Sequence, residues 1–279
     1  MAQVHQAPHE LPPKPNGLKV KKPNFVIFMP DQLRYDALGC TGNKVWTPSL
    51  SRPTLTSRAP LRARHLHEQL VKTPNIDAFA AQGTRFTNCF VQASVCSQSR
   101  CSMFTGNYPH VSGHRSLEAL IKPWEPNLFR SLKERGGYHV ACLAPRGDTF
   151  APTVTELSVD EYGFLETPEF IPSFTGLGGD AKDDIWSRLF YKGLRNNAEA
   201  MDYDDAVVRS ALKWLDCPPK DKPWVLFMPL IFPHCPFQVE EPYFSMYDRG
   251  QMPPPSDPHL KVSYLVSPEH SSPFPMLTR

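Results

Sequence analysis

Two continuous apolar runs, Phe25–Met29 and Trp224–Leu230, place the strongest constraint on the fold of this chain. A strand with one face in water alternates apolar and polar residues, whereas neither run alternates, so both are predicted to be buried strands of a parallel sheet. Further strands are expected over 138–143 and over Arg85–Val91. Helical patterns separate the strands, and they cover 73–83, 126–135 and 200–215. This alternation predicts an α/β fold with a mostly parallel sheet flanked by helices. The acids Asp202, Asp204 and Asp205 at the start of the last helix are predicted to cap it, with a metal site as the alternative.

The segment Cys96–Gly106 brings a cysteine, hydroxyl groups and a fixed cation together in a short stretch. Residues four apart on a helix share a face, so a helix here puts Cys96 and Arg100 one turn apart on the same side. Backbone N–H groups at the helix start are expected to receive an anionic ester. If the cysteine stays a thiol, Arg100 and the helix N-terminus are expected to lower its pKa. The alternative is a Ser/Cys-rich turn before a buried helix, with Arg100 in a surface ion pair.

Asp31 and Gln32 follow the first apolar run after a single proline, and His234 follows the last run. Open α/β sheets bind ligands beyond the carboxyl ends of their strands, which is where Asp31 is expected. Carboxylate and amide oxygens suit calcium or magnesium, and histidine titrates near neutral pH, as a general acid should. A turn or helix cap is the alternative for Asp31 and Gln32, and a structural role between prolines is the alternative for His234.

Together, the segments Lys21–Gln32, Cys96–Gly106 and Leu230–Phe237 resemble the type I sulfatases, which are the formylglycine-dependent sulfatases of the alkaline-phosphatase-like superfamily. The resemblance implies an alkaline-phosphatase-like sheet and oxidation of Cys96 to formylglycine, whose hydrated aldehyde attacks sulfur. It also implies that Arg100 holds the resulting alkoxide beside a divalent metal. Calcium is the metal expected first, with magnesium or manganese as alternatives.

The resemblance assigns the remaining site residues as well. Asp31 and Gln32 are expected to ligate the metal together with the nucleophile derived from Cys96. His234 is expected to contact the sulfate and to protonate the leaving alcohol. The chain departs from the family signature at Gln98, where proline or alanine is expected.

A second departure follows the strand predicted at 138–143. The common family pattern there is G-K-x-H, which supplies a lysine and a histidine to the sulfate, but this chain reads Ala144–Thr149. Arg146 is the candidate for the missing cation and is assigned to substrate binding, with Asp148 to orient it. A surface turn Pro-Arg-Gly-Asp is the alternative. The departure indicates a subfamily that acts on a different ester, such as a phosphodiester or a phosphonate.

Proline accounts for 31 of the 279 residues and gathers outside the motifs. Residues 1–21 are predicted to be a disordered tail, 22–250 a sulfatase-type catalytic domain with an irregular insert at 46–70, and 251–279 an irregular tail. The distal metal ligands of the family are an Asp-His or Asp-Asn pair, and neither dipeptide occurs in this sequence. The resemblance therefore implies a truncated chain. We hypothesise that 46–70 and 262–279 are retained introns, which continuous reads across both in mature messenger RNA would contradict.

The composition and net charge exclude some classes of binding partner. A net charge of +2 gives no electrostatic case for nucleic acid, and the N-terminal segment shows neither a signal peptide nor a membrane anchor. Seven cysteines, an odd number, suit a reducing compartment, so a cytoplasmic location is expected. The expected partners are a small sulfate ester or related anionic ester and, transiently, the formylglycine-generating enzyme. Three functions remain open: a sulfatase, a phosphonate monoester or phosphodiester hydrolase, and an inactive truncated fragment without the distal metal ligands.

Overall fold

The computed structural model describes residues 21–41, 71–144, 148–166, 191–195, 202–248 and 250. These residues form two compact units. The first unit contains 21–32, 90–144, 148–166 and 202–235, and the second contains 33–41, 71–89, 191–195, 236–248 and 250. The predicted insert 46–70 and the predicted tails, apart from Lys21, lie outside the described residues.

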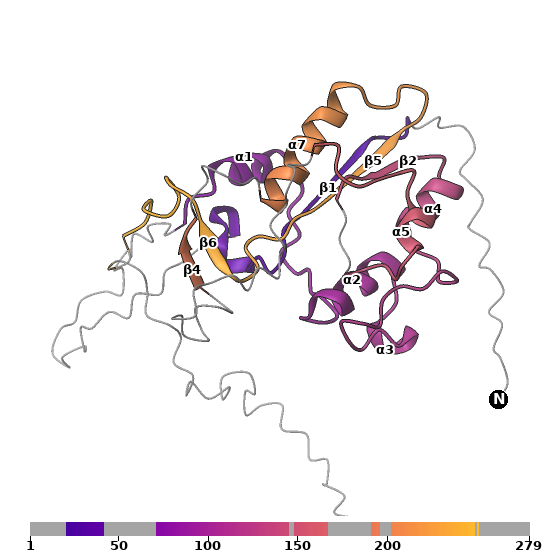
Figure 1. Cartoon of the computed structure of the whole chain (residues 1–279), viewed down its shortest axis with the longest axis horizontal. Coiled ribbons are helices and arrows are strands. Elements are labelled where there is room, and N and C mark those ends of the chain that lie inside the picture. The colour runs from indigo at the N-terminus through magenta and orange to yellow at the C-terminus, as the bar shows by residue number, and fades with distance from the viewer. Residues whose placement is uncertain are drawn as a thin grey trace, which may run out of the picture. The chain divides into compact units, whose positions relative to one another are not determined.

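A four-stranded parallel sheet forms the centre of the first unit (Figure 1). Its strands lie in the order β1-β5-β2-β3, and their bounds are β1 Phe25–Met29, β2 His139–Cys142, β3 Glu161–Tyr162 and β5 Trp224–Pro229. The predicted parallel α/β sheet is therefore confirmed. Because the strands run the same way, their carboxyl ends lie along one edge, where open α/β sheets bind ligands.

The burial of β1 differs from the expectation. Phe25, Val26 and Phe28 are 43, 53 and 55 % exposed, whereas Val225 and Leu226 of β5 are fully buried. Among the described strands β1 lies at the edge and pairs with β5 alone, while β5 is flanked on both sides. The same apolar pattern therefore marks a buried strand at the centre of the sheet and an exposed one at its edge, where packing partners are fewer.

Two clusters of buried side chains cover the two faces of the sheet. Successive residues of a strand point to opposite faces, so Val225 and Phe227 belong to one cluster and Leu226 and Met228 to the other. Figure 1 shows the helices that cover the first face, which are α2 (Cys96–Thr105), α4 (Leu128–Glu134) and α5 (Val154–Ser158). The second face is covered by α7 (Tyr203–Asp216).

Helix α2 is anchored to the first face by an aromatic side chain near its end. The ring of Phe104 lies 4.7 Å from that of Phe129 and 5.4 Å from that of Phe227, measured between centroids. Truncating a buried phenylalanine to alanine costs about 3–5 kcal/mol. Gly106 ends the helix with a φ of 73°, which glycine adopts without strain. These contacts fix the helix that begins at Cys96.

Side-chain caps begin two of the described helices, α4 and α7. The Asn127 side chain accepts a hydrogen bond from the Arg130 N–H at 3.0 Å and begins α4. Asp202 and Asp205 form a reciprocal capping box at the start of α7. The capping role predicted for the acids of this segment is confirmed for these two residues.

The remaining described elements are short. The first unit also contains α3 (Pro109–Ser112), and the second contains η1 (Tyr35–Ala37), η2 (Gly39–Thr41), α1 (Pro74–Gln82) and the parallel pair β4 (Tyr191–Leu194) and β6 (Phe237–Val239). The strand expected over Arg85–Val91 is absent from this described segment, which has a turn at Thr87 and Asn88 and is otherwise irregular. Its apolar residues do not pack, since Phe86 and Phe90 are 76 and 80 % exposed. None of the helices within the described ranges has the length and apolar character needed to cross a membrane.

Candidate functional site

Asp31 lies just beyond the carboxyl end of β1, where the sequence places it. It is 6 % exposed, and its backbone N–H donates to the carbonyl oxygen of Phe232, which follows β5, at 3.3 Å. The ends of two adjacent parallel strands are joined by this bond. Gln32 comes next and is exposed, with a φ of 60°. A residue other than glycine adopts this left-handed conformation at a cost of roughly 1–2 kcal/mol, so the turn after Asp31 is held by its surroundings.

Helix α2 brings Cys96 and Arg100 to Asp31. Cys96 is the first helical residue, and Val95 before it provides no side-chain cap for the first-turn N–H groups. Arg100, one turn later, is 5 % exposed, and its Nη2 lies 3.3 Å from Asp31 Oδ2. The surface-ion-pair alternative for Arg100 is therefore wrong, because both partners are buried. The predicted common face of Cys96 and Arg100 is confirmed by their shared neighbour.

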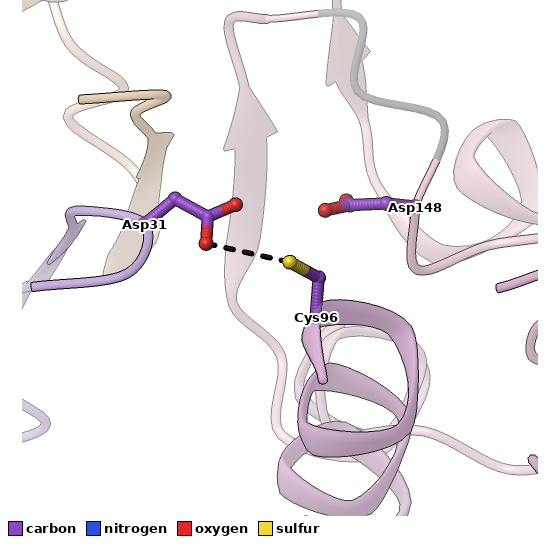
Figure 2. A group of neighbouring side chains, drawn as sticks. All are labelled: Asp31, Cys96 and Asp148. Carbon is purple, nitrogen blue, oxygen red and sulfur yellow. Dashed lines mark hydrogen bonds between the residues drawn. The ribbon is translucent and has the colours of Figure 1, made fainter. Parts of the chain in front are cut away.

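A third side chain, Asp148, faces the same point from the loop after β2 (Figure 2). The Cys96 thiol donates to Asp31 Oδ1 at 3.5 Å, and one ligand atom from each of Asp31, Cys96 and Asp148 lies within 4.8 Å of the others. Arg100 also contacts Asp148, with its Nε 3.1 Å from Oδ2. The guanidinium thus bridges two carboxylates beside the cysteine.

The position of Asp148 was not predicted from the sequence, which assigned it to orient Arg146. Arg146 lies outside the described residues, so its predicted contact with Asp148 stays a prediction, and Asp148 pairs with Arg100. The available signal was the place of Asp148 in the chain. It follows the strand 139–142, whose carboxyl end lies at the same sheet edge as that of β1.

Burial and charge act together on the Cys96 thiol. Desolvation raises its pKa most, followed by the negative charge of Asp31, the hydrogen bond to Asp31 and the charge of Asp148, while Arg100 lowers it. The net pKa is raised above the ordinary thiol value. The expected lowering is therefore wrong, because two carboxylates and burial outweigh one guanidinium.

His234 lies in the loop after β5 and is half-buried. Its Nδ1 is 2.6 Å from the carbonyl oxygen of Cys235, which can only accept, so Nδ1 carries a proton and donates it to that carbonyl. Asp204 holds this loop: its Oδ1 accepts from the Ile231 N–H at 2.7 Å and its Oδ2 from the Phe232 N–H at 2.9 Å. The sequence predicted a helix-capping role for Asp204, but its carboxylate supports the histidine loop.

The residues present suit a divalent cation. Asp31 and Asp148 supply hard carboxylate oxygens, and their combined charge exceeds that of Arg100 by one negative unit. Arg100 Nη1 is buried and has no hydrogen-bond partner among the described residues. Because a buried unpaired donor is costly, it indicates a place for an acceptor atom of a ligand. The residues of the site could thus hold a cation and an anionic group together.

The fold and the site define the class of protein first. A parallel sheet that carries a cysteine helix and a carboxylate at the carboxyl edge of its strands is the alkaline-phosphatase-like arrangement that the sequence predicts. Residues 23–267 match the Sulfatase family, which is most of the 279 residues. The chain belongs to the sulfatase family.

Curated relatives agree with this membership. The arylsulfatase of Clostridium perfringens is 25 % identical over 262 residues, which cover 84 % of this chain and 48 % of that protein. The N-acetylglucosamine-6-O-sulfatase of Bacteroides thetaiotaomicron is 19 % identical, over 87 % of this chain and 36 % of that protein. The chain therefore spans about half or less of the length of these relatives.

Solved structures share the fold. The phosphonate monoester hydrolase of Agrobacterium radiobacter has a TM-score of 0.53 and 22 % identity, covering 84 % of this chain and 45 % of that one. Ps i-CgsB in complex with k-i-k-neocarrahexaose has a TM-score of 0.54 and 22 % identity, covering 81 % of this chain and 49 % of that one. At these identities the likeness shows the fold, and it confirms the alkaline-phosphatase-like architecture.

Proposed function

We propose that this chain carries the nucleophile of a sulfuric ester hydrolase, with Cys96 used as formylglycine and with a divalent metal held at Asp31 and Gln32. Calcium is the first candidate for the metal, and magnesium or manganese are alternatives. The observation that carries the proposal is the buried pair of Arg100 and Asp31, which stands directly beside Cys96. Membership of the sulfatase family supports it.

Each side chain has a distinct role on this proposal. Arg100 donates from Nη1 to an anionic oxygen at the nucleophile, where preorganised donors are most effective. His234 protonates the leaving alcohol from Nε2, because its Nδ1 proton is committed to the Cys235 carbonyl. A bound metal supplies a Lewis acid and a charge clamp. The hydrated aldehyde has two hydroxyl groups. One attacks the sulfur, and the other later gives up its proton as sulfate is expelled and the aldehyde re-forms. Arg146 remains a proposed contact of the ester.

The test is the chemical state of Cys96 together with turnover. The tryptic peptide that ends at Arg100 also contains Cys89, which is exposed and serves as an internal reference. Co-expression with a formylglycine-generating enzyme should convert Cys96 and leave Cys89 a thiol, as read from the peptide mass. In a full-length form, aryl sulfate hydrolysis should disappear in Cys96→Ala and persist in Cys89→Ser. Turnover that survives Cys96→Ala would reject the proposed nucleophile.

A phosphonate monoester or phosphodiester hydrolase is the second candidate. The observation that favours it is Asp148, which stands beside Arg100 in the segment where the common sulfatase pattern supplies a lysine and a histidine. Parallel assays with aryl sulfate and aryl phosphonate esters separate the two enzymes. The third candidate, an inactive fragment, predicts that metal titration finds no site at Asp31.

We further propose a reducing, cytoplasmic location. All seven cysteines of the chain are unpaired, which supports a compartment that keeps thiols reduced. Fractionation of cells that express a tagged chain tests this location directly. Recovery of the chain in a secreted fraction would contradict it.

A further inference from the structure

The proposed hydrolysis assigns no chemical step to Asp148, although this residue belongs to the same cluster. Asp31 and Asp148 approach the Arg100 guanidinium at two different nitrogens, Nη2 and Nε, and both carboxylates face the Cys96 thiol (Figure 2). A carboxylate that only neutralised Arg100 would be redundant, because Asp31 already pairs with it. The three side chains instead place a thiol sulfur and two carboxylate groups around one point.

We propose that Asp148 is the third protein ligand of a divalent-cation site shared with Asp31 and Cys96, and that this site selects zinc over calcium while Cys96 is a thiol. The proposal rests on the proposed function only in placing a cation beside Asp31. It concerns the unconverted protein, which is the form that exists whenever Gln98 prevents oxidation of the cysteine.

The separation of the ligand atoms suits zinc. A tetrahedral zinc site has Zn–S near 2.3 Å and Zn–O near 2.1 Å, which places sulfur and oxygen roughly 3.6 Å apart. Cys96 Sγ and Asp31 Oδ1 are 3.5 Å apart. The ligand atom of Asp148 lies within 4.8 Å of both, so a side-chain movement of roughly 1 Å brings this atom within zinc-ligand distance. Calcium takes about 6–8 oxygen ligands and gains nothing from sulfur, so it is the poorer fit to this set.

The charges also suit a divalent ion. Zinc binds the thiolate, so the Cys96 proton is released to solvent as the Zn–S bond forms. The two carboxylates and the thiolate then carry three negative charges, and Arg100 carries one positive charge. The net charge of two negative units matches that of a divalent cation. Three protein ligands leave the fourth zinc position to water or an anion. The buried Arg100 Nη1, which has no partner among the described residues, is the donor for that group.

Alkylation read by mass spectrometry tests the site cysteine by cysteine. The full chain, with Cys96 verified as a thiol, is treated with iodoacetamide in zinc, in calcium or in chelator. We expect zinc to slow alkylation of Cys96 at least about 10-fold and calcium to leave it unchanged, because the metal-bound thiolate is shielded. The exposed cysteines Cys89 and Cys217 are internal references whose rates should not change.

Variants then assign the ligands. Asp148→Asn should weaken zinc protection of Cys96 by at least about 10-fold, which is the loss that even an outer-shell partner of a metal ligand causes, and the exposed Asp216→Asn should not. Asp148→His supplies a nitrogen that zinc accepts, so it should restore protection by zinc, whereas a residue needed only to pair with Arg100 could not be replaced by histidine. Circular dichroism of each variant reports folding, and the histidine variant keeps the test decisive if the asparagine variant unfolds.

Three results would overturn the inference: equal protection in the wild type and Asp148→Asn, failure of Asp148→His to protect, or protection by calcium equal to that by zinc. None of these three results contradicts the proposed hydrolysis, because that proposal is tested by the turnover of the aldehyde form. Conversely, an inactive aldehyde form with a zinc-protected thiol would reject the proposed function and leave the zinc site standing.

Discussion

Replacement of Arg100 by lysine tests whether the guanidinium bridge holds the site together. Arg100 reaches Asp31 at 3.3 Å through Nη2 and Asp148 at 3.1 Å through Nε, and the Arg100 and Asp31 side chains are each 6 % exposed. Lysine has one nitrogen in place of this fork, so it can keep only one of the two contacts. The other carboxylate then loses a charged hydrogen bond, which is worth about 1.5–3 kcal/mol.

Urea unfolding followed by circular dichroism measures the loss. Arg100→Lys should lower the free energy of unfolding by about 1.5–3 kcal/mol, or Tm by about 3–12 °C for a domain of this size. Arg130→Lys is the matched control, because Arg130 pairs with Glu134 on the surface, where the side chains are 31 and 50 % exposed. Its loss should be about 1 kcal/mol or less. Equal losses would refute the reasoning, since the bridge would then be worth no more than a surface pair.

Further predictions concern modification, loop position and pH. Gln98→Pro should raise the aldehyde content of the motif cysteine and the sulfatase activity of a full-length form, and equal aldehyde content in both proteins would show that glutamine is tolerated. Asp204→Asn removes an acceptor from the loop before His234 and should lower kcat more than it raises KM, with Asp216→Asn as the neutral control. Burial raises the pKa of Cys101 from 9.0 to about 11, so the folded chain keeps a proton that the unfolded chain loses. Stability in urea should therefore fall as pH rises from about 9 to about 11, and Cys101→Ser should reduce this fall.

Local pattern was sufficient for the strands and helices that build the site. The unbroken apolar runs predicted β5 and β1 as parallel strands, and the four-residue spacing of Cys96 and Arg100 predicted their common side. The same patterns failed where neighbours decide the outcome. The apolar run of β1 does not reveal that the strand lies at an edge, and the aromatic residues of Arg85–Val91 imitate a strand that has no partner.

Charge balance could not be predicted, because it depends on distances between residues far apart in the chain. The pKa of Cys96 rises rather than falls because Asp31, 65 residues away, approaches the thiol and Asp148 adds a second negative charge. Asp204 was predicted as a helix cap because its local context is a helix start. Its carboxylate accepts hydrogen bonds from Ile231 and Phe232, which are 27 and 28 residues away. Long-range polar contacts of this kind leave no periodic signal in a single sequence.

The charge of Asp148 bears on which esters the proposed enzyme accepts. Asp31 and Asp148 carry two negative charges, Arg100 one positive and the cation two positive, so the site holds one positive charge. That balances a sulfate monoester, a phosphonate monoester or a phosphodiester, whereas a phosphate monoester carries nearly two negative charges at neutral pH. Two unit charges about 4 Å apart interact by roughly 4 kcal/mol at an effective dielectric constant of 20. A full-length form should therefore prefer aryl sulfate or aryl phosphonate to aryl phosphate, and Asp148→Asn should shift this ratio toward aryl phosphate at saturating metal. A ratio that Asp148→Asn leaves unchanged would show that the carboxylate takes no part in choosing the ester.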